Sequence, residues 1–501
     1  MMKRTLIFVG YYDNLAFDTA KSELLKGGEV FMVGCDQRVG ICHCNYGATS
    51  LICRLCSHQN KQLFRDFRGD SRFHWKMMGD LISDDICHLA ASASFDYDDV
   101  ASLKALQYKG VDIGYAAFST YVSVTRNLTP SFNSDMKAFL DDLLRSEIRL
   151  IEALQRYVEE IRPDLMVVMC GRHSNQKPIY QLALNNHIDF IVTERKWTEN
   201  DEDTYDFFVN DSPHSNLAIY HRMQDCWAVG GDDKVEIAKT FFDNRRYGHY
   251  AADTIYTKKQ EQGLLPDGFD QSKTNIAIFN SSEDEYYSIS RECDEYGVWN
   301  NQYTALKAIF EHYRQRGDMH FYLRIHPNLS GVNFKSHTIL YTLQYDNVTI
   351  IPPDSPVSSY ALLDNCQKVM VFNSSLGLEG AYWGKPVIVL NESYYNYMGI
   401  VHLPKTEGEV YQMIDDPDLP SLKSDECLKA GYFFMSGTQK KLQYYPTVRK
   451  KYGKGRWQFE GYSLFKLCHS SFLSALVFKL LRISTYLGII GRHNHITQRT
   501  V

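Results

Sequence analysis

Short apolar runs alternate with amphipathic stretches along most of the chain. Residues 4–9 and 29–34 are largely apolar and each run meets a glycine at its end, as buried parallel strands followed by turns do. From 135 to 161 apolar residues recur every three or four positions, which predicts a long amphipathic helix ending before Pro163. A strand–helix–strand unit is then predicted over residues 165–193.

A second alternating series begins near residue 274. Because short strands alternate strictly with helices, it predicts an open parallel sheet covered by helices on both faces. The predicted strands are 275–279, 320–325, 348–351, 368–372 and 386–390, and the predicted helices are 302–316, 334–343, 357–363 and 378–383. The fold class is therefore α/β, with two Rossmann-like domains that face a central cleft.

Domain boundaries follow from the polar stretch at 243–273, which we expect to link the two sheets. The N-terminal domain is predicted over 1–250 and the C-terminal domain over 274–460.

Residues 461–501 are predicted to form a tail with an apolar segment at 471–490. Lys479 and Arg482 share one face of that segment. A membrane-spanning helix would bury both charges, and each burial would cost about 2.5–3.5 kcal/mol. We expect an amphipathic helix, and leave open whether it packs on the protein or lies on a membrane surface.

Composition narrows the choice of function. The chain has 501 residues, 44% of them hydrophobic, which is enough for two or more cores. A net charge of −6 with interspersed signs provides no basic face, so we expect no nucleic-acid partner. The N-terminal apolar run is too short for a secretory signal, which predicts a cytoplasmic protein, with peripheral contact at the inner face of the membrane as an addition.

Polar loops leave the predicted C-terminal strands at 324–328, 351–355 and 372–379. The carboxyl ends of parallel strands border a ligand crevice, so these loops should converge. Ser374, Ser375 and Gly377 open a helix whose amides suit a diphosphate, and Glu379 is placed to bind a ribose. The alternative is that the serines only cap the helix and the glutamate only complements its dipole.

These motifs carry a resemblance to a known family. The segments Arg324–Pro327, Ile351–Ser355, Asn373–Glu379 and Trp383–Val387 are similar to those of bacterial capsule and surface-polysaccharide glycosyltransferases of the GT-B fold. The likeness covers mainly residues 274–400. It implies that His326, Ser374, Ser375 and Glu379 contact a nucleotide-sugar donor.

A departing nucleoside diphosphate needs its charge neutralised, and Arg324 with the helix-start amides is the expected means. Because no Asp-x-Asp follows a strand of this sheet, transfer is predicted to need no metal and no other cofactor. The acidic runs 201–203 and 283–285 are read as solvated faces, with a divalent-ion site as the alternative.

The acceptor hydroxyl needs a general base, and the predicted N-terminal strands offer three candidates. Asp13, His173 and Glu194 each follow or end a strand. Each is equally placed to cap the next element, so both interpretations stay open.

A cysteine-rich insertion occupies residues 35–58. Cys35, Cys42, Cys53 and Cys56 are predicted to form a structural zinc site, with Cys44 as a substitute ligand. An iron–sulfur cluster is the second choice, and a group of buried thiols is the alternative without metal.

Together these features predict a glycosyltransferase that moves a hexosyl or related sugar from a nucleotide sugar to an oligosaccharide or lipid-linked acceptor of a capsule or surface polysaccharide. The alternatives are a nucleotide-sugar 2-epimerase or a polyol-phosphate transferase on the same scaffold, since a fold does not determine its chemistry. A non-enzymatic, metal-stabilised assembly module is the third.

Overall fold

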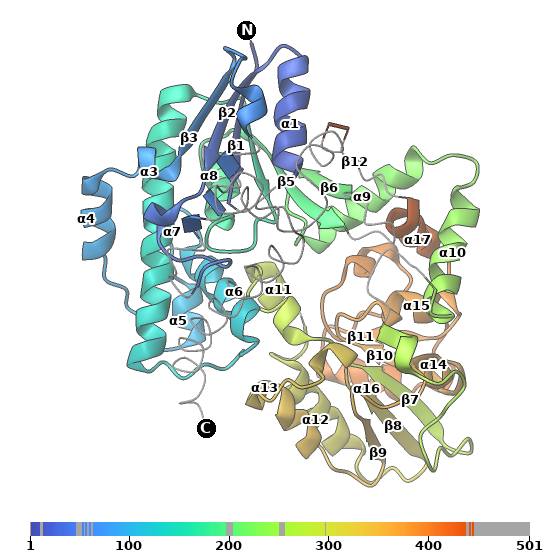
Figure 1. The fold of residues 1–501 in the computed structure, drawn as a ribbon. Coiled ribbons are helices and arrows are strands. Elements are labelled where there is room, and N and C mark those ends of the chain that lie inside the picture. The colour runs from blue at the N-terminus through green and yellow to red at the C-terminus, as the bar shows by residue number, and fades with distance from the viewer. Residues whose placement is uncertain are drawn as a thin grey trace, which may run out of the picture.

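Two lobes, each built around a β-sheet, make up the molecule (Figure 1). The strand order is β12-β6-β5-β4-β1-β2-β3 in the N-terminal sheet and β11-β10-β7-β8-β9 in the C-terminal sheet. This arrangement confirms the predicted α/β class with two Rossmann-like units. The computed structural model describes residues 2–10, 14–46, 53–54, 56–57, 60–61, 64–196, 204–249, 256–295, 297–436, 440–441 and 443–444.

The N-terminal sheet combines a parallel portion with an antiparallel edge. Its strands are β1 (Arg4–Val9), β2 (Glu29–Gly34), β3 (Phe73–Met77), β4 (Leu165–Met169), β5 (Asp189–Lys196), β6 (Thr204–Val209) and β12 (Lys440–Lys441). Strands β1 to β5 pair in parallel, whereas β6 runs antiparallel to both β5 and β12. This antiparallel edge was not predicted from the sequence; residues 197–203, which separate β5 from β6, are too few for the crossover connection that parallel pairing needs.

Alternation along β1 explains how this sheet is covered on both faces. Leu6 and Phe8 pack in one hydrophobic cluster with residues of α7, and Ile7 and Val9 pack in another with residues of α1. Successive side chains of a strand point to opposite faces, so both sets are buried. The helices of this lobe are α1 (Asn14–Leu25), α3 (Met78–Leu81), α4 (Asp84–Ser92), α5 (Val100–Lys104), α6 (Ile113–Thr125), α7 (Ser134–Ile161) and α8 (Lys177–Asn185).

The C-terminal sheet pairs in parallel throughout its described strands. These are β7 (Thr274–Phe279), β8 (Met319–Arg324), β9 (Val348–Ile351), β10 (Lys368–Val371) and β11 (Val387–Val389). Its helices are α11 (Arg291–Glu295), α12 (Gln302–Tyr313), α13 (Lys335–Thr338), α14 (Ser359–Asn365), α15 (Leu376–Tyr382) and α16 (Glu407–Asp415). Ile276 and Ile278 face α12, while Ala277 and Phe279 share the opposite cluster with residues of α14 and α15.

Three helices lie between the lobes: α9 (Asn216–Ala228), α10 (Lys234–Arg246) and α17 (Glu426–Ser436). Met223 and Phe242, from α9 and α10, are buried in the same cluster as Phe279 of β7. The expected boundary near residue 250 therefore does not separate the two cores, because the apolar faces of α9 and α10 are covered by the C-terminal lobe. Strand β12, which the division at 274–460 assigns to the C-terminal domain, pairs with β6 instead.

The segment 282–294, which follows β7, joins the lobes through buried polar contacts. Asp284 forms an ion pair with Arg126 at 2.7 Å, and Asp294 forms one with Lys104 at 2.7 Å. Both basic residues belong to the N-terminal lobe, at the end of α6 and in α5. These contacts fix how the strand ends of the two sheets face each other.

Within the described residues, none of the helices has the length and apolarity needed to cross a bilayer. The predicted tail helix at 471–490 lies outside the described residues.

Candidate functional site

A cavity of about 440 Å³ lies between the two lobes. Its C-terminal wall contains Ser281 and Ser282 after β7, His326 after β8, and residues 373–375 after β10. The three polar loops predicted to converge were those after β8, β9 and β10. The loops after β8 and β10 do meet here, with a further loop after β7, whereas no residue of 351–355 lines this cavity.

Arg245 supplies the fixed positive charge of the C-terminal wall. It lies in the last turn of α10, and its side chain lines the cavity. Its Nε donates to a carboxylate oxygen of Glu379 at 2.9 Å, and its Nη2 donates to the Ser375 hydroxyl at 2.7 Å. Two bonds at fixed angles orient the guanidinium toward the ligand space, which is the geometry that suits phosphate oxygens.

Glu379 does not reach the cavity, contrary to its expected role with a ribose. Its side chain is 1% exposed and is held by Arg245 on one oxygen and by the Tyr360 hydroxyl on the other. Burial and the neighbouring Glu379 raise the pKa of Tyr360, so this hydroxyl stays a donor. The glutamate therefore positions Arg245, and losing either partner would strand a buried charge.

Arg324 does not reach the cavity either, so it is not the cation of this wall. Its guanidinium is buried and donates to the carbonyl oxygens of Pro352 at 2.7 Å and Ser355 at 3.0 Å. Burial lowers the pKa of Arg324 to about 10. Arg324 thus stabilises the loop after β9, where it satisfies two carbonyl groups.

Backbone amides at the start of α15, which the sequence suggested could bind a diphosphate, already donate to groups of Ser374. The amide of Gly377 donates to the Ser374 carbonyl at 2.9 Å, and the amide of Leu376 donates to the Ser374 hydroxyl at 3.3 Å. A Cβ on Gly377 would lie 2.4 Å from the Tyr395 hydroxyl, so this glycine permits close packing under the loop. Ser374 and Ser375 line the cavity, and Gly377 does not.

His326 borders the cavity as predicted. Its backbone amide donates to Asn280 Oδ1 at 2.7 Å, and its Nδ1 accepts from the Asn328 amide at 3.2 Å. Its ring meets Tyr256 edge-on at 5.0 Å. The ring is thereby held in place with Nδ1 as the acceptor.

The N-terminal wall carries ionisable groups. Glu194 of β5 and His214, in the turn before α9, line the cavity, with Cys170 behind them at the end of β4. Cys170 Sγ lies 3.6 Å from His214 Nε2. Burial, followed by the nearby carboxylate, raises the pKa of Cys170 to about 12, and burial lowers that of His214 to about 3. Of the two predicted bases that the structure describes, Glu194 lines the cavity and His173 does not.

His173 lies behind this wall and does not line the cavity. Its Nδ1 lies 3.1 Å from Gln176 Oε1 and its Nε2 lies 3.0 Å from the Ser123 hydroxyl, so both ring nitrogens are engaged. Burial lowers its pKa well below the usual value. The structure therefore gives His173 a supporting role, and Asp13 lies outside the described residues.

The acidic runs do not gather as a metal site in the described residues. Asp284 pairs with Arg126, and Glu283 accepts the amide of Gln302 at 3.1 Å. Burial raises the pKa of Glu283 to about 7. Residues 201–203 lie outside the described part of the chain.

The cysteines of the cysteine-rich segment lie near enough to influence one another's ionisation, but in the described residues no three of their sulfur atoms lie within 4.8 Å of one another. Cys42, Cys56 and Cys53 all act electrostatically on Cys35, whose pKa is raised first by burial and then by these neighbours. His43 of this segment stacks on His173 with ring centroids 3.9 Å apart. The insertion therefore packs behind the N-terminal wall, and bound zinc or an iron–sulfur cluster stays a prediction.

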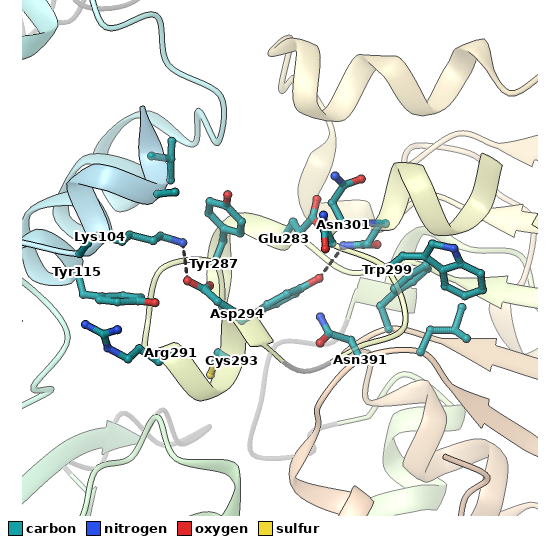
Figure 2. Close-up of a pocket in the computed structure, with 18 residues that line it drawn as sticks. Lys104, Tyr115, Glu283, Tyr287, Arg291, Cys293, Asp294, Trp299, Asn301 and Asn391 are labelled. Atoms are coloured by element: carbon teal, nitrogen blue, oxygen red, sulfur yellow. Dashed lines mark hydrogen bonds and ion pairs between the residues drawn. The ribbon is translucent and has the colours of Figure 1, made fainter. Parts of the chain in front are cut away.

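A second cavity of about 410 Å³ adjoins the first, since Tyr286 and Cys293 line both. Figure 2 shows Tyr115 on one side of it and Trp299 on the other, with Lys104 reaching Asp294 between the lobes. Aromatic faces beside polar groups suit saccharides. The sequence motifs did not indicate this cavity, because its lining comes from distant segments.

Arg245 was also missed from sequence. It stands in a basic pair, Arg245-Arg246, at the end of helix α10, inside the stretch 243–273 that was predicted to be a linker. The sequence around Arg245 does not indicate that this helix packs on the C-terminal lobe.

The fold and the cavity define an α/β protein of two Rossmann-like lobes with its ligand site between them. Residues 286–408 match the family model described as capsule polysaccharide biosynthesis protein. This match confirms the resemblance indicated by the motifs, over the part of the chain that it covers. A search of curated proteins found no match.

Solved structures with a similar arrangement include two transferase domains and an epimerase. The Thermosulfurimonas dismutans KpsC β-Kdo 2,4-transferase is 12% identical, with 54% of this chain and 79% of that chain covered at a TM-score of 0.36. The β-Kdo 2,7-transferase of the same protein is 13% identical, with 60% and 89% covered at 0.33. UDP-GlcNAc 2-epimerase from Neisseria meningitidis is 12% identical, with 90% and 99% covered at 0.28. TM-scores this low do not support an assignment of function. The family match and the residues of the cavity are therefore the basis for one.

Proposed function

We propose that this protein is a glycosyltransferase that moves a sugar from a nucleotide-sugar donor to an oligosaccharide or lipid-linked acceptor of a capsule or surface polysaccharide. One observation carries the proposal. A single cavity has a fixed guanidinium and hydroxyl groups on one wall and the carboxylate of Glu194 on the other. The family match over 286–408 supports the same class of pathway.

The C-terminal wall would bind the nucleoside diphosphate. Arg245, Ser374 and Ser375 offer a cation and two hydroxyls to phosphate oxygens, and His326 borders the same space. The charge that develops on the leaving diphosphate is stabilised by Arg245, which is already oriented by Glu379 before the reaction. The proposed binding of the diphosphate at the C-terminal wall requires no metal ion.

Glu194 would act as the general base. It takes the proton from the acceptor hydroxyl as that oxygen forms a bond with the anomeric carbon. The bond from the anomeric carbon to the diphosphate oxygen breaks, and its electron pair leaves with the nucleoside diphosphate. One proton moves to Glu194, and no oxidant or reductant is required.

The second cavity would hold the acceptor chain. Tyr115 and Trp299 provide ring faces for sugar rings, and Asn301 and Asn391 provide hydrogen-bonding groups (Figure 2). Its shared border with the first cavity at Tyr286 would let a chain end reach the anomeric carbon. We propose that the reaction takes place in the cytoplasm.

Calorimetry with nucleoside diphosphates and a transfer assay with labelled nucleotide sugars test the proposal. We expect binding of at least one nucleoside diphosphate and acceptor-dependent release of it from the matching sugar. Interconversion of nucleotide-sugar isomers without acceptor would instead identify an epimerase. Absence of binding across a panel of nucleotides would contradict the proposal and favour a non-enzymatic assembly role.

A further inference from the structure

Three side chains of types that bind metal ions lie together on the N-terminal wall. Cys170 follows β4, Glu194 lies in β5, and His214 precedes α9. The β4–β5 register pairs Met169 with Thr193, so Cys170 and Glu194 come next to each other at the strand ends. One ligand atom from each of Cys170, Glu194 and His214 lies within 4.8 Å of the other two.

Their spacing matches a tetrahedral ion. Cys170 Sγ lies 3.6 Å from His214 Nε2. A zinc ion about 2.3 Å from sulfur and about 2.0–2.1 Å from nitrogen holds these two donors about 3.6 Å apart at a tetrahedral angle. A set of thiolate, imidazole and carboxylate ligands favours zinc over magnesium or calcium, which prefer oxygen alone.

The fourth position of such an ion faces the cavity. His173 Nδ1 also lies near Cys170 Sγ, at 3.8 Å, but both nitrogens of that ring already have partners. Glu194 and His214 line the cavity, so the side of the group away from Cys170 is open to a ligand. Three protein ligands and one open position are the arrangement of a catalytic zinc site, whereas structural sites have four protein ligands.

The backbone at Cys170 supports a specific role for this residue. Its φ is +64°, in the left-handed region that residues other than glycine rarely adopt. Such a conformation persists where the surrounding structure fixes it, and it is concentrated at functional sites. Here the amide of Cys170 is fixed by a 2.7 Å bond to the Thr193 carbonyl, which holds the thiol beside His214.

We propose that Cys170, Glu194 and His214 bind one Zn²⁺ ion on the acceptor wall of the cavity. This site is separate from the zinc site predicted for Cys35, Cys42, Cys53 and Cys56. Its role rests on the proposed glycosyltransferase function: when bound, the ion would make an acceptor hydroxyl at its fourth position more acidic, and the second oxygen of Glu194 would accept the proton.

Metal analysis of the full-length protein tests the site. We expect about one zinc ion per chain to be lost in Cys170→Ser and in His214→Ala, with zinc affinity reduced by more than the roughly 10–100-fold that loss of an outer partner causes. Cobalt(II) added to metal-free protein should show a thiolate-to-metal absorption band that Cys170→Ser reduces. Cys87→Ser, which changes a partly exposed cysteine on α4, is the matched control.

Two outcomes would overturn the inference: unchanged zinc content in both variants, or no zinc bound by wild-type protein. Zinc that survives in Cys170→Ser but is lost in Cys53→Ser would belong to the cysteine-rich segment alone. Thermal unfolding of each variant checks folding, and Glu194→Gln, a smaller change, provides a third ligand variant. Nucleoside diphosphate binding measured on the same samples separates failure of this inference from failure of the proposed function.

Discussion

The two walls of the cavity are built from the same kind of sheet edge but carry opposite chemistry. On the C-terminal wall, hydroxyl groups and the guanidinium of Arg245 line the cavity, and the partner carboxylate of Glu379 is buried. On the N-terminal wall lie the carboxyl group of Glu194 and the imidazole of His214, whose pKa burial lowers to about 3. The difference indicates that one wall holds a ligand of fixed charge, while the other handles a proton.

The largest expected effect comes from the N-terminal wall. In Glu194→Gln the base is removed with little change in shape, so kcat should fall by about 10²–10⁴-fold while nucleoside diphosphate affinity stays within about twofold. Transfer assays and calorimetry measure the two quantities. Glu159→Gln, an exposed change on α7, is the control. If the affinity for nucleoside diphosphate fell as much as kcat, Glu194 would also bind the donor, which would contradict the assignment of separate roles to the two walls.

Arg245→Ala should show the opposite pattern. Loss of a charged hydrogen-bond donor weakens nucleoside diphosphate binding by about 1.5–3 kcal/mol, and the stranded Glu379 lowers the free energy of unfolding by about 3–5 kcal/mol. Arg246→Ala, its neighbour, which pairs with Asp364, is the control. Adding Glu379→Gln to Arg245→Ala should restore stability but not affinity. Restoration of both would show that Arg245 acts only in packing.

Trp299→Ala sharpens the assignment of the second cavity. Loss of one stacking ring should raise KM for the acceptor by about two- to twelvefold, from roughly 0.5–1.5 kcal/mol of aromatic contact, and leave donor affinity unchanged. Acceptor titrations measure the effect, with Trp227→Ala on α9 as control. A change in donor affinity instead would place the donor in this cavity.

The smallest effect concerns Glu283, between the two cavities. Its folded pKa of about 7 lies above the ordinary value of 4.5. The folded state therefore favours the protonated form, so this group's contribution is present below about pH 4.5 and is lost as pH rises toward 7. Melting temperatures of wild type should fall more between about pH 5 and pH 8 than those of Glu283→Gln, by a few degrees. Identical pH profiles would contradict the shift.

Much of the fold could be predicted because its periodicities are local. The long helix at 134–161 begins where Asn133 caps it and ends before Pro163, and both signals stand in the sequence. The β5–β6 hairpin could not be predicted in the same way, because residues 197–203 between the two strands contain no Asn-Gly or Asp-Gly pair to mark a tight turn.

Only those parts of the site that are formed by residues adjacent in the sequence could be predicted. Ser374 and Ser375 lie where the motif placed them, at the exit of β10. Arg324 was expected in the cavity, yet its guanidinium turns to two carbonyl groups of the next loop. The cation that does line the cavity is Arg245, which meets Glu379 from 134 residues away, and no local pattern reports such a contact.

In the part of the chain that the structure describes, two connections link the lobes, one from β6 to α9 and one from α17 toward β12. Since β6 and β12 pair with each other, both connections lie along one edge of the N-terminal sheet. Both covalent links between the lobes therefore lie at one edge, and the ion pairs Arg126–Asp284 and Lys104–Asp294 add non-covalent links between the same two lobes. A backbone cut between β6 and α9 would divide the chain into two pieces, with β12 of the second piece still pairing with β6 of the first.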